Sequence, residues 1–251
     1  MKRLMTAWAR SGIILVSLLV PLSLWAQTDI ESVYLVDISS SMLELYGSGD
    51  RNLLKDVICY IKNNVESLPD DHSSVTLIVF AARVNTIRWD PVNSRIKTDI
   101  YRYLDRLADS TMNAWKNNPE SLSSTYISRA VLAAYASLQH NPNRWRQNLH
   151  LFSDGELLIP PDDPQPLDYP NMMQQLESYH INAHDLRFFY YFPLLISANR
   201  YLQELVNREG GEIREHYEAD LCTQSVTLYH DYRILLSVKD HHLHPFPAVT
   251  I

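Results

Sequence analysis

Cysteine, glycine and positive charge are scarce in this 251-residue chain, and each shortage excludes a class of protein. Two cysteines are too few for a disulfide scaffold of this length, and six glycines exclude glycine-repeat or low-complexity architectures. Lysine and arginine total 22 against 29 acidic residues, so the net charge is −7. A nucleic-acid partner is not expected, because phosphate contacts need a basic stripe. The composition is 46% apolar, which is enough for one sizeable hydrophobic core.

Residues 1–26 have the pattern of a cleaved secretory signal peptide. Lys2, Arg3 and Arg10 form a positive leader, and the apolar run 13–25 follows it. This run is too short to span a bilayer comfortably, so we expect no membrane span after cleavage. Cleavage would leave 19 basic and 29 acidic residues, a net charge of −10. We therefore expect an exported protein, either periplasmic or secreted, and the short leader favours the periplasm.

Short apolar runs alternate with segments of helical periodicity through the rest of the chain. The run 74–81 is nearly all apolar and β-branched, which is typical of a strand buried on both faces. This alternation predicts one doubly wound α/β domain over residues 27–238, with a mostly parallel sheet and helices on both faces, followed by an irregular tail at 239–251. The expected strands are 32–36, 74–81, 84–89, 149–152, 186–192 and 212–217, and the expected helices are 51–68, 96–108, 125–139, 171–179, 198–209 and 219–236.

Hydroxyl and carboxylate side chains follow the apolar runs, at the edge where the ligands of such sheets bind. Asp37, Ser39 and Ser41 come after the first strand, Thr125 opens the alanine-rich helix, and Asp154 follows a later strand. Two carboxylates and three hydroxyls form an all-oxygen set, which a hard divalent cation prefers and which roughly neutralises its charge. Since the protein ligands are few, water completes the coordination, which suits Mg²⁺. One water position can then be exchanged for a carboxylate of a partner.

This pattern resembles the von Willebrand factor type A family and its metal-ion-dependent adhesion site. The family motif is Asp-x-Ser-x-Ser after the first strand, then Thr before a helix, then Asp followed by Gly after a later strand. The resemblance covers about 30–236 and implies a Rossmann-like fold that binds Mg²⁺, with Mn²⁺ and Ca²⁺ as alternatives. It departs at Ser124, where the family often has glycine. It implies that three hydroxyls bind the metal and that two carboxylates bind it directly or through water: Ser39, Ser41 and Thr125, and Asp37 and Asp154.

Three functions remain open at this point. The resemblance implies a binding module, in which the metal captures a protein partner through a partner carboxylate, as in an adhesin, a receptor or an assembly scaffold. The same fold with a degenerate, unoccupied metal site would be structural. A magnesium-dependent, phosphatase-like hydrolase would use Asp37 as nucleophile and needs a general acid two residues on, where Ser39 stands. Other hydrolase and phosphate-binding motifs are missing from the sequence, so we expect that the protein is not an enzyme.

Three long loops are expected around the site, at 42–50, 109–124 and 156–168. The middle loop would expose Trp115 as an apolar anchor for a partner. The last loop is acidic, through Glu156, Asp162, Asp163 and Asp168, so either the partner is basic around one acidic residue, or a loop acid such as Glu44 or Glu156 fills the open metal position until it is displaced.

The two cysteines, Cys59 and Cys222, lie far apart in the chain. An oxidising compartment permits a disulfide between them, but the sequence does not give their distance.

Overall fold

The computed structural model describes residues 29–43, 53–139, 146–161, 163–179, 186–193 and 198–216. The expected signal peptide, the expected last helix with Cys222, and the expected tail lie outside these residues. The elements in chain order are β1 (Ile30–Asp37), α2 (Ser40–Leu43), α3 (Leu53–Ser67), β2 (Ser73–Phe80), β3 (Val84–Trp89), α4 (Ser94–Asn117), η1 (Pro119–Leu122), α5 (Ile127–Gln139), β4 (Arg146–Phe152), α6 (Tyr169–Leu176), β5 (Leu186–Pro193), α7 (Arg200–Arg208) and β6 (Glu212–His216).

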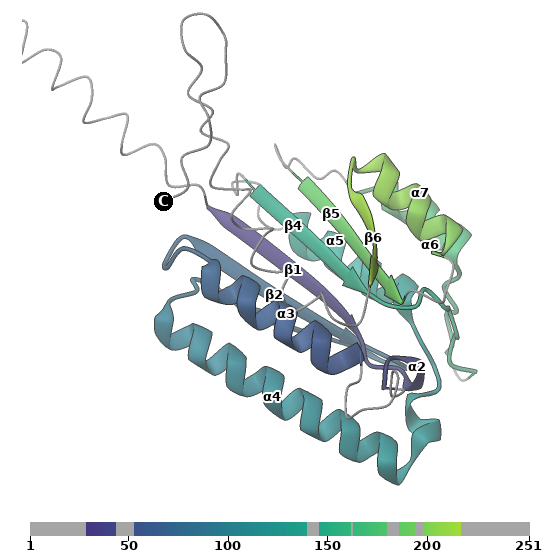
Figure 1. Cartoon of the computed structure of the whole chain (residues 1–251). Coiled ribbons are helices and arrows are strands. Elements are labelled where there is room, and N and C mark those ends of the chain that lie inside the picture. The colour runs from purple at the N-terminus through teal and green to yellow at the C-terminus, as the bar shows by residue number, and fades with distance from the viewer. Residues whose placement is uncertain are drawn as a thin grey trace, which may run out of the picture.

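A six-stranded sheet in the order β3-β2-β1-β4-β5-β6 forms the middle layer (Figure 1). All neighbouring strands are parallel except β3, which runs antiparallel to β2 at one edge. The predicted α/β fold with a mostly parallel sheet is therefore confirmed. Asp37 pairs with Phe80, and Val36 pairs with Phe152, so β1 ends level with both of its neighbours. Side chains that follow these three strands consequently meet at one end of the sheet.

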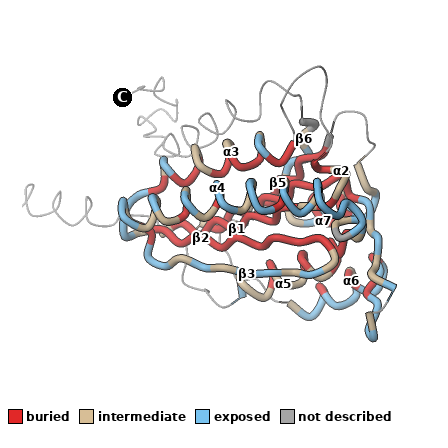
Figure 2. Tube along the Cα trace, turned by 90° about the horizontal axis from the view of Figure 1, so that it is seen from below, coloured by how far each residue is buried: buried red, intermediate tan, exposed pale blue. Residues whose placement is uncertain are grey.

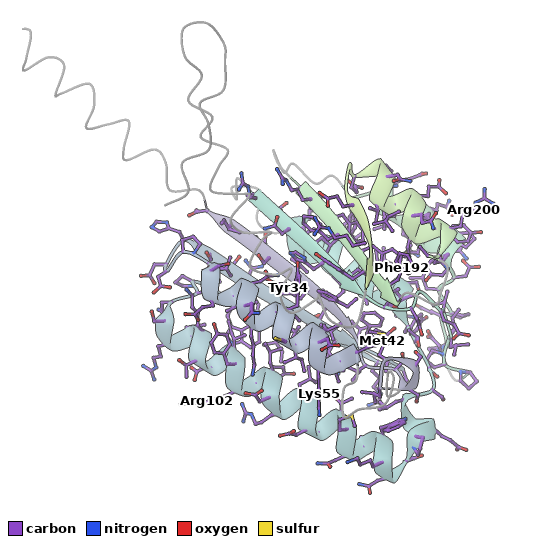
Figure 3. All side chains as sticks on the ribbon, viewed as in Figure 1. Tyr34, Met42, Lys55, Arg102, Phe192 and Arg200 are labelled. Atoms are coloured by element: carbon purple, nitrogen blue, oxygen red, sulfur yellow. The ribbon has the colours of Figure 1, made fainter. Side chains whose placement is uncertain are left out.

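Helices cover both faces of the sheet, and each face has its own apolar core. On one face, Tyr34 and Val36 of β1 pack under α3 and α4. On the other face, Val33 and Leu35 of the same strand pack against α5, α6 and α7. This alternation along β1 follows from the period of two in a strand. Figure 2 shows the buried central strands between helices that expose their outer sides, and in Figure 3 Tyr34 lies in the interior, whereas Arg102 and Arg200 point outward.

Helix α4 is much longer than the sequence predicted. We expected a helix over 96–108 and then a long loop, but α4 continues to Asn117 and is followed by η1, so the predicted loop at 109–124 is wrong. The apolar stripe continues through Met112 and Trp115, which pack partly buried against the core on the α3 side. Trp115 is therefore a core-facing residue of α4 and not the exposed anchor that the sequence suggested.

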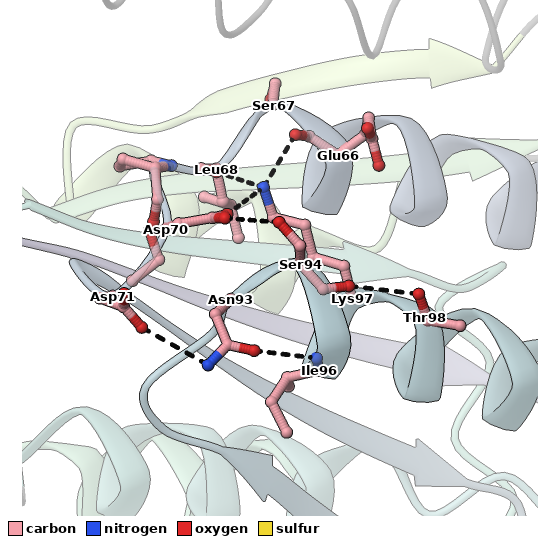
Figure 4. Close-up of polar contacts among 12 residues, drawn as sticks. Glu66, Ser67, Leu68, Asp70, Asp71, Asn93, Ser94, Ile96, Lys97 and Thr98 are labelled. Carbon is pink, nitrogen blue, oxygen red and sulfur yellow. Dashed lines mark hydrogen bonds and ion pairs between the residues drawn. The ribbon is translucent and has the colours of Figure 1, made fainter.

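Polar contacts hold the beginning of α4 against the end of α3 (Figure 4). Asn93 caps α4, because its side-chain oxygen accepts a hydrogen bond of 3.1 Å from the Ile96 N–H. The Lys97 ammonium lies 2.8 Å from the Asp70 carboxylate and donates to the Leu68 carbonyl over 2.6 Å. No helix in the part of the chain described above is long and apolar enough to cross a membrane.

Candidate functional site

Asp37 ends β1 in the centre of the sheet, and its side chain is 0% exposed. Two donors hold its carboxylate. The Ser39 N–H donates to Oδ1 over 2.8 Å, and the Ser153 hydroxyl donates to Oδ2 over 2.6 Å. Ser153 directly follows β4, the strand beside β1, so this hydrogen bond joins two neighbouring strand ends. Ser153 was not among the predicted site residues, although its place directly before Asp154 was a signal.

Ser39, Ser41 and Asp154 form a chain of polar contacts beside Asp37. The hydroxyl oxygens of Ser39 and Ser41 lie 3.1 Å apart, and the Ser41 hydroxyl donates to Oδ2 of Asp154. The other oxygen of Asp154 accepts from the Glu156 N–H over 3.0 Å. Ser41 lies in the short helix α2, which begins one residue after Ser39 and brings the two hydroxyls together. Hydrogen bonds therefore link four of the five predicted site residues, and Asp37 joins this chain through the Ser39 N–H.

Thr125 lies at the same end of the sheet, but not where the sequence placed it. We expected it to open the helix 125–139, whereas α5 begins at Ile127. Thr125 instead forms an isolated antiparallel bridge with Leu158, with backbone hydrogen bonds of 3.0 and 3.1 Å. The next residue, Tyr126, donates its N–H to the Ala81 carbonyl just after β2. Thr125 is thus buried beside the segment that follows Asp154, and among the described residues no side-chain hydrogen bond joins it to the other four.

Two buried carboxylates face one another in this site. Asp154 is 5% exposed, and within the described ranges neither Asp37 nor Asp154 has an ion pair with Lys, Arg or His. Burial, followed by the charge of Asp154, raises the pKa of Asp37 to about 7, although the hydrogen bonds from Ser153 and Ser39 oppose this rise. The site therefore carries negative charge that the described side chains do not neutralise.

The loop 156–168 is less acidic at its surface than its composition suggested. The Asp163 carboxylate accepts hydrogen bonds from Arg129 and Tyr126, and Asp168 caps α6 by accepting from the Asn171 N–H over 2.9 Å. Glu156 is exposed beside the site. Glu44 and Asp162 lie outside the described residues.

The sequence matches no protein-family model and no curated protein. Its structure is similar to the von Willebrand factor type A protein from Catenulispora acidiphila, with a TM-score of 0.56 and 13% identity over 80% of this chain and 42% of that one. For the SpaC pilus adhesin from Lactobacillus rhamnosus GG the TM-score is 0.56 and the sequence identity 13%, over 82% of this chain and 31% of SpaC. For BatB from Bacteroides thetaiotaomicron the TM-score is 0.52 and the sequence identity 15%, over 81% of this chain and 97% of BatB.

This chain has a von Willebrand factor type A-like fold. At these identities the likeness concerns the fold. The chain spans less than half of the Catenulispora protein and of SpaC, and nearly all of BatB.

The donor set of this type A-like domain fits a hard divalent cation. Carboxylate and hydroxyl oxygens are the ligands that Mg²⁺ and Ca²⁺ prefer, whereas zinc sites use Cys and His. No group of three or more His, Cys, Asp or Glu side chains in the described part of the chain could hold a metal ion, so an all-carboxylate or His/Cys centre is not present there. The two facing carboxylates, Asp37 and Asp154, are the charges that a cation would neutralise.

Proposed function

We propose that this protein is an exported binding module that holds a divalent cation, most simply Mg²⁺, and captures a protein partner through it. The observation that carries the proposal is the pair of buried carboxylates, Asp37 and Asp154, without a described cationic side chain beside either. Leaving such charges unpaired in the interior costs several kcal/mol per ion, roughly, so a bound cation gives the arrangement a physical reason.

The cation would be held by Asp37, Ser39, Ser41, Thr125 and Asp154. It would supply the positive charge and a coordination position that water or a partner carboxylate can occupy. The chain itself orients the carboxylates: Ser153 and the Ser39 N–H hold Asp37, while the Glu156 N–H holds Asp154. The hydroxyls of Ser39 and Ser41 lie between the two, where they add ligands without adding charge.

A protein partner is the interpretation that the similar structures support. SpaC is a pilus adhesin, PilB from Streptococcus sanguinis is a minor pilin, and a third similar structure is a matrix protein of the mussel byssus. The predicted signal peptide would deliver this chain to a compartment where such contacts form, the periplasm or the outside. We infer that the partner offers a carboxylate to the metal from a basic surround, because the processed chain has a net charge of −10 from 19 basic and 29 acidic residues.

One observation favours a second candidate, a structural domain with a degenerate site. Ser41 donates to Asp154, and Ser39 contacts Ser41, so these polar groups have hydrogen-bond partners within the chain itself. A phosphatase-like hydrolase has no such support, because the position two residues after Asp37 is a serine whose N–H binds that aspartate.

Thermal unfolding of the protein purified after export tests the metal. Magnesium at a hundredfold its dissociation constant should stabilise the fold by about 2.7 kcal/mol, which raises the midpoint by roughly 5–10 °C relative to EDTA. Asp37→Asn should abolish this shift. Asp105→Asn, which removes an exposed carboxylate of α4, is the matched control and should keep it. Capture of candidate partners with Mg²⁺ against EDTA follows.

The absence of any shift with Mg²⁺, Mn²⁺ or Ca²⁺ at tens of millimolar would favour the degenerate domain. A shift that survives Asp37→Asn would place the metal elsewhere in the chain.

A further inference from the structure

Residues that are not predicted metal ligands hold the turn that carries Asp154. The carbonyl of Gly155, the next residue, accepts two hydrogen bonds. The Tyr169 hydroxyl donates to it over 2.9 Å, and Nδ2 of Asn199 donates over 3.1 Å. Tyr169 begins α6 and Asn199 caps α7, so two helices of the same layer hold a single carbonyl.

The turn has little freedom to move under these two donors. Gly155 has a φ of +78°, in the left-handed region that favours glycine, and a Cβ placed on it would collide with the Tyr190 hydroxyl and lie 3.0 Å from Cβ of Asn199. On the other side of the peptide, the Glu156 N–H donates to Oδ1 of Asp154 over 3.0 Å. The carbonyl of Gly155 and the N–H of Glu156 belong to one planar peptide unit. A rotation of that unit therefore moves the N–H that orients the Asp154 carboxylate.

We propose that Tyr169 and Asn199 are positioning residues, which fix the Gly155–Glu156 peptide and through it the Asp154 carboxylate. Asn199 also couples the site to α7, because its Oδ1 accepts from the N–H groups of Tyr201 and Leu202 over 3.0 and 3.4 Å. One amide side chain thus joins the first turn of α7 to the Asp154 turn. The expected effect on metal affinity rests on the proposed function, whereas the effect on the metal-free turn rests on these hydrogen bonds alone.

Two neutral substitutions remove the donors and keep the other roles of these residues. Tyr169→Phe removes the hydroxyl and keeps the ring, which stacks on Tyr201 at 5.4 Å between centroids. Asn199→Ser is too short to reach Gly155, but serine remains a good N-cap for α7. The matched control is Tyr135→Phe on α5, which removes a buried hydroxyl that donates to Glu209 over 3.1 Å.

Hydrogen exchange of the Glu156 amide in EDTA is the first readout, on protein purified after export. Tyr169→Phe and Asn199→Ser should each accelerate this exchange roughly tenfold, because the peptide loses one of its two anchors. Tyr135→Phe should leave it unchanged. The second readout is the magnesium dissociation constant from calorimetric titration, which should rise roughly tenfold in both test variants and stay unchanged in the control.

Unchanged Glu156 exchange in both test variants would overturn the proposal, whatever the metal result. If wild-type protein binds no magnesium, the proposed function fails, and the exchange data still decide whether the two residues position the turn. Faster exchange with an unaltered magnesium constant would show that the turn moves without affecting the metal, which also overturns their role in positioning the site.

Discussion

Strand β1 buries a carboxylate at each end, and the two carboxylates have opposite surroundings. Glu31, near the start, is 0% exposed, and its Oε1 lies 2.9 Å from the Arg88 guanidinium while its Oε2 accepts from Nε2 of Gln147 over 2.9 Å. Asp37, at the end, is equally buried. It receives hydrogen bonds from the Ser153 hydroxyl and from Ser39, and the charge that acts on it is that of another carboxylate, Asp154.

The difference separates a buried charge that has a cation beside it from one that has none among the described residues. A buried carboxylate that has its own cation needs nothing further, although the pair itself contributes little net stability. A buried carboxylate that faces a second carboxylate requires a proton or a cation from solution. The same strand therefore carries a completed ion pair at one end of the sheet and an incomplete one at the end where parallel sheets bind ligands.

Beside the middle of β1 lies a third buried titratable group, the neutral side chain of His150. His150 of β4 pairs with Tyr34 in the sheet, and the two rings stack with centroids 4.9 Å apart. On the other side, Phe189 stacks on it at 5.0 Å, and the Tyr60 hydroxyl lies 3.3 Å from Nδ1. Burial, followed by the charge of Arg214, lowers the pKa of His150 to about 3.

The largest change in the free energy of unfolding is expected at the Glu31–Arg88 ion pair. Arg88→Met removes the guanidinium that contacts the buried Glu31 carboxylate and should lower the free energy of unfolding by about 3–5 kcal/mol, measured by urea denaturation. The double variant Glu31→Gln/Arg88→Met removes both charges and should recover most of this loss. Equal losses in the single and double variants would mean that the contacts of the Arg88 side chain, and not the charge of Glu31, matter.

At the Asp37 end of β1, removing a charge should raise the free energy of unfolding instead of lowering it. Asp37→Asn removes one of two facing carboxylates, so in EDTA at pH 8 it should raise the free energy of unfolding by on the order of 2 kcal/mol. The proposed metal site predicts the opposite order in saturating magnesium, because only the wild type would gain stability from the metal. A variant less stable than the wild type in EDTA would show that Asp37 is satisfied without a cation, and the contrast with Glu31 would disappear.

In the middle, stability should fall with acid. A histidine in the unfolded chain has a pKa near 6.5 and binds a proton below that pH, whereas His150 in the folded protein stays neutral down to about pH 3. The free energy of unfolding therefore decreases as the pH falls from about 6.5 toward 3. Between pH 7.5 and 5.5 the loss from this residue is about 1.4 kcal/mol. Urea midpoints of the wild type and His150→Phe, compared at both pH values in EDTA, isolate it. Parallel pH slopes in the two proteins would refute the assignment.

The smallest effect is expected for a charge pair at the surface. Lys62 of α3 contacts Asp105 of α4, and both side chains are partly exposed. Lys62→Met should change the free energy of unfolding by about 0.5 kcal/mol or less, since water screens the pair. A loss as large as that of Arg88→Met would mean that burial does not decide the value of these pairs.

Much of the candidate site could be predicted because its parts are local in the sequence. Asp37, Ser39 and Ser41 lie within five residues after an apolar run, and Asp154 follows another, so the rule that strand ends meet places them together. The length of α4 could not be predicted as well. Thr111, Met112 and Trp115 continue its core-facing side, but the polar residues around them resemble a loop: Asp109, Ser110, Asn113, Lys116 and Asn117.

The partners of these groups could not be predicted, because they come from distant parts of the chain. Glu31, an acid next to an apolar run, indicated that a buried charge needs a partner. Nothing near it in the sequence indicated that the partners are Arg88 and Gln147. Tyr169 and Asn199 similarly reach the Gly155 carbonyl from the starts of two later helices.

The alternation of strands and helices, and the residue types that end the strands, can be read from the amino-acid order, because apolar periodicity and turn chemistry act over a few residues. Which buried carboxylate lies beside a cation depends on how the chain packs in three dimensions. Glu31 and Arg88 are 57 residues apart and meet across β1, β2 and β3, whereas Asp37 and Asp154 meet because β1 and β4 are neighbours. Electrostatic energy in a buried site depends on distances between such groups, and only the packed sheet sets those distances.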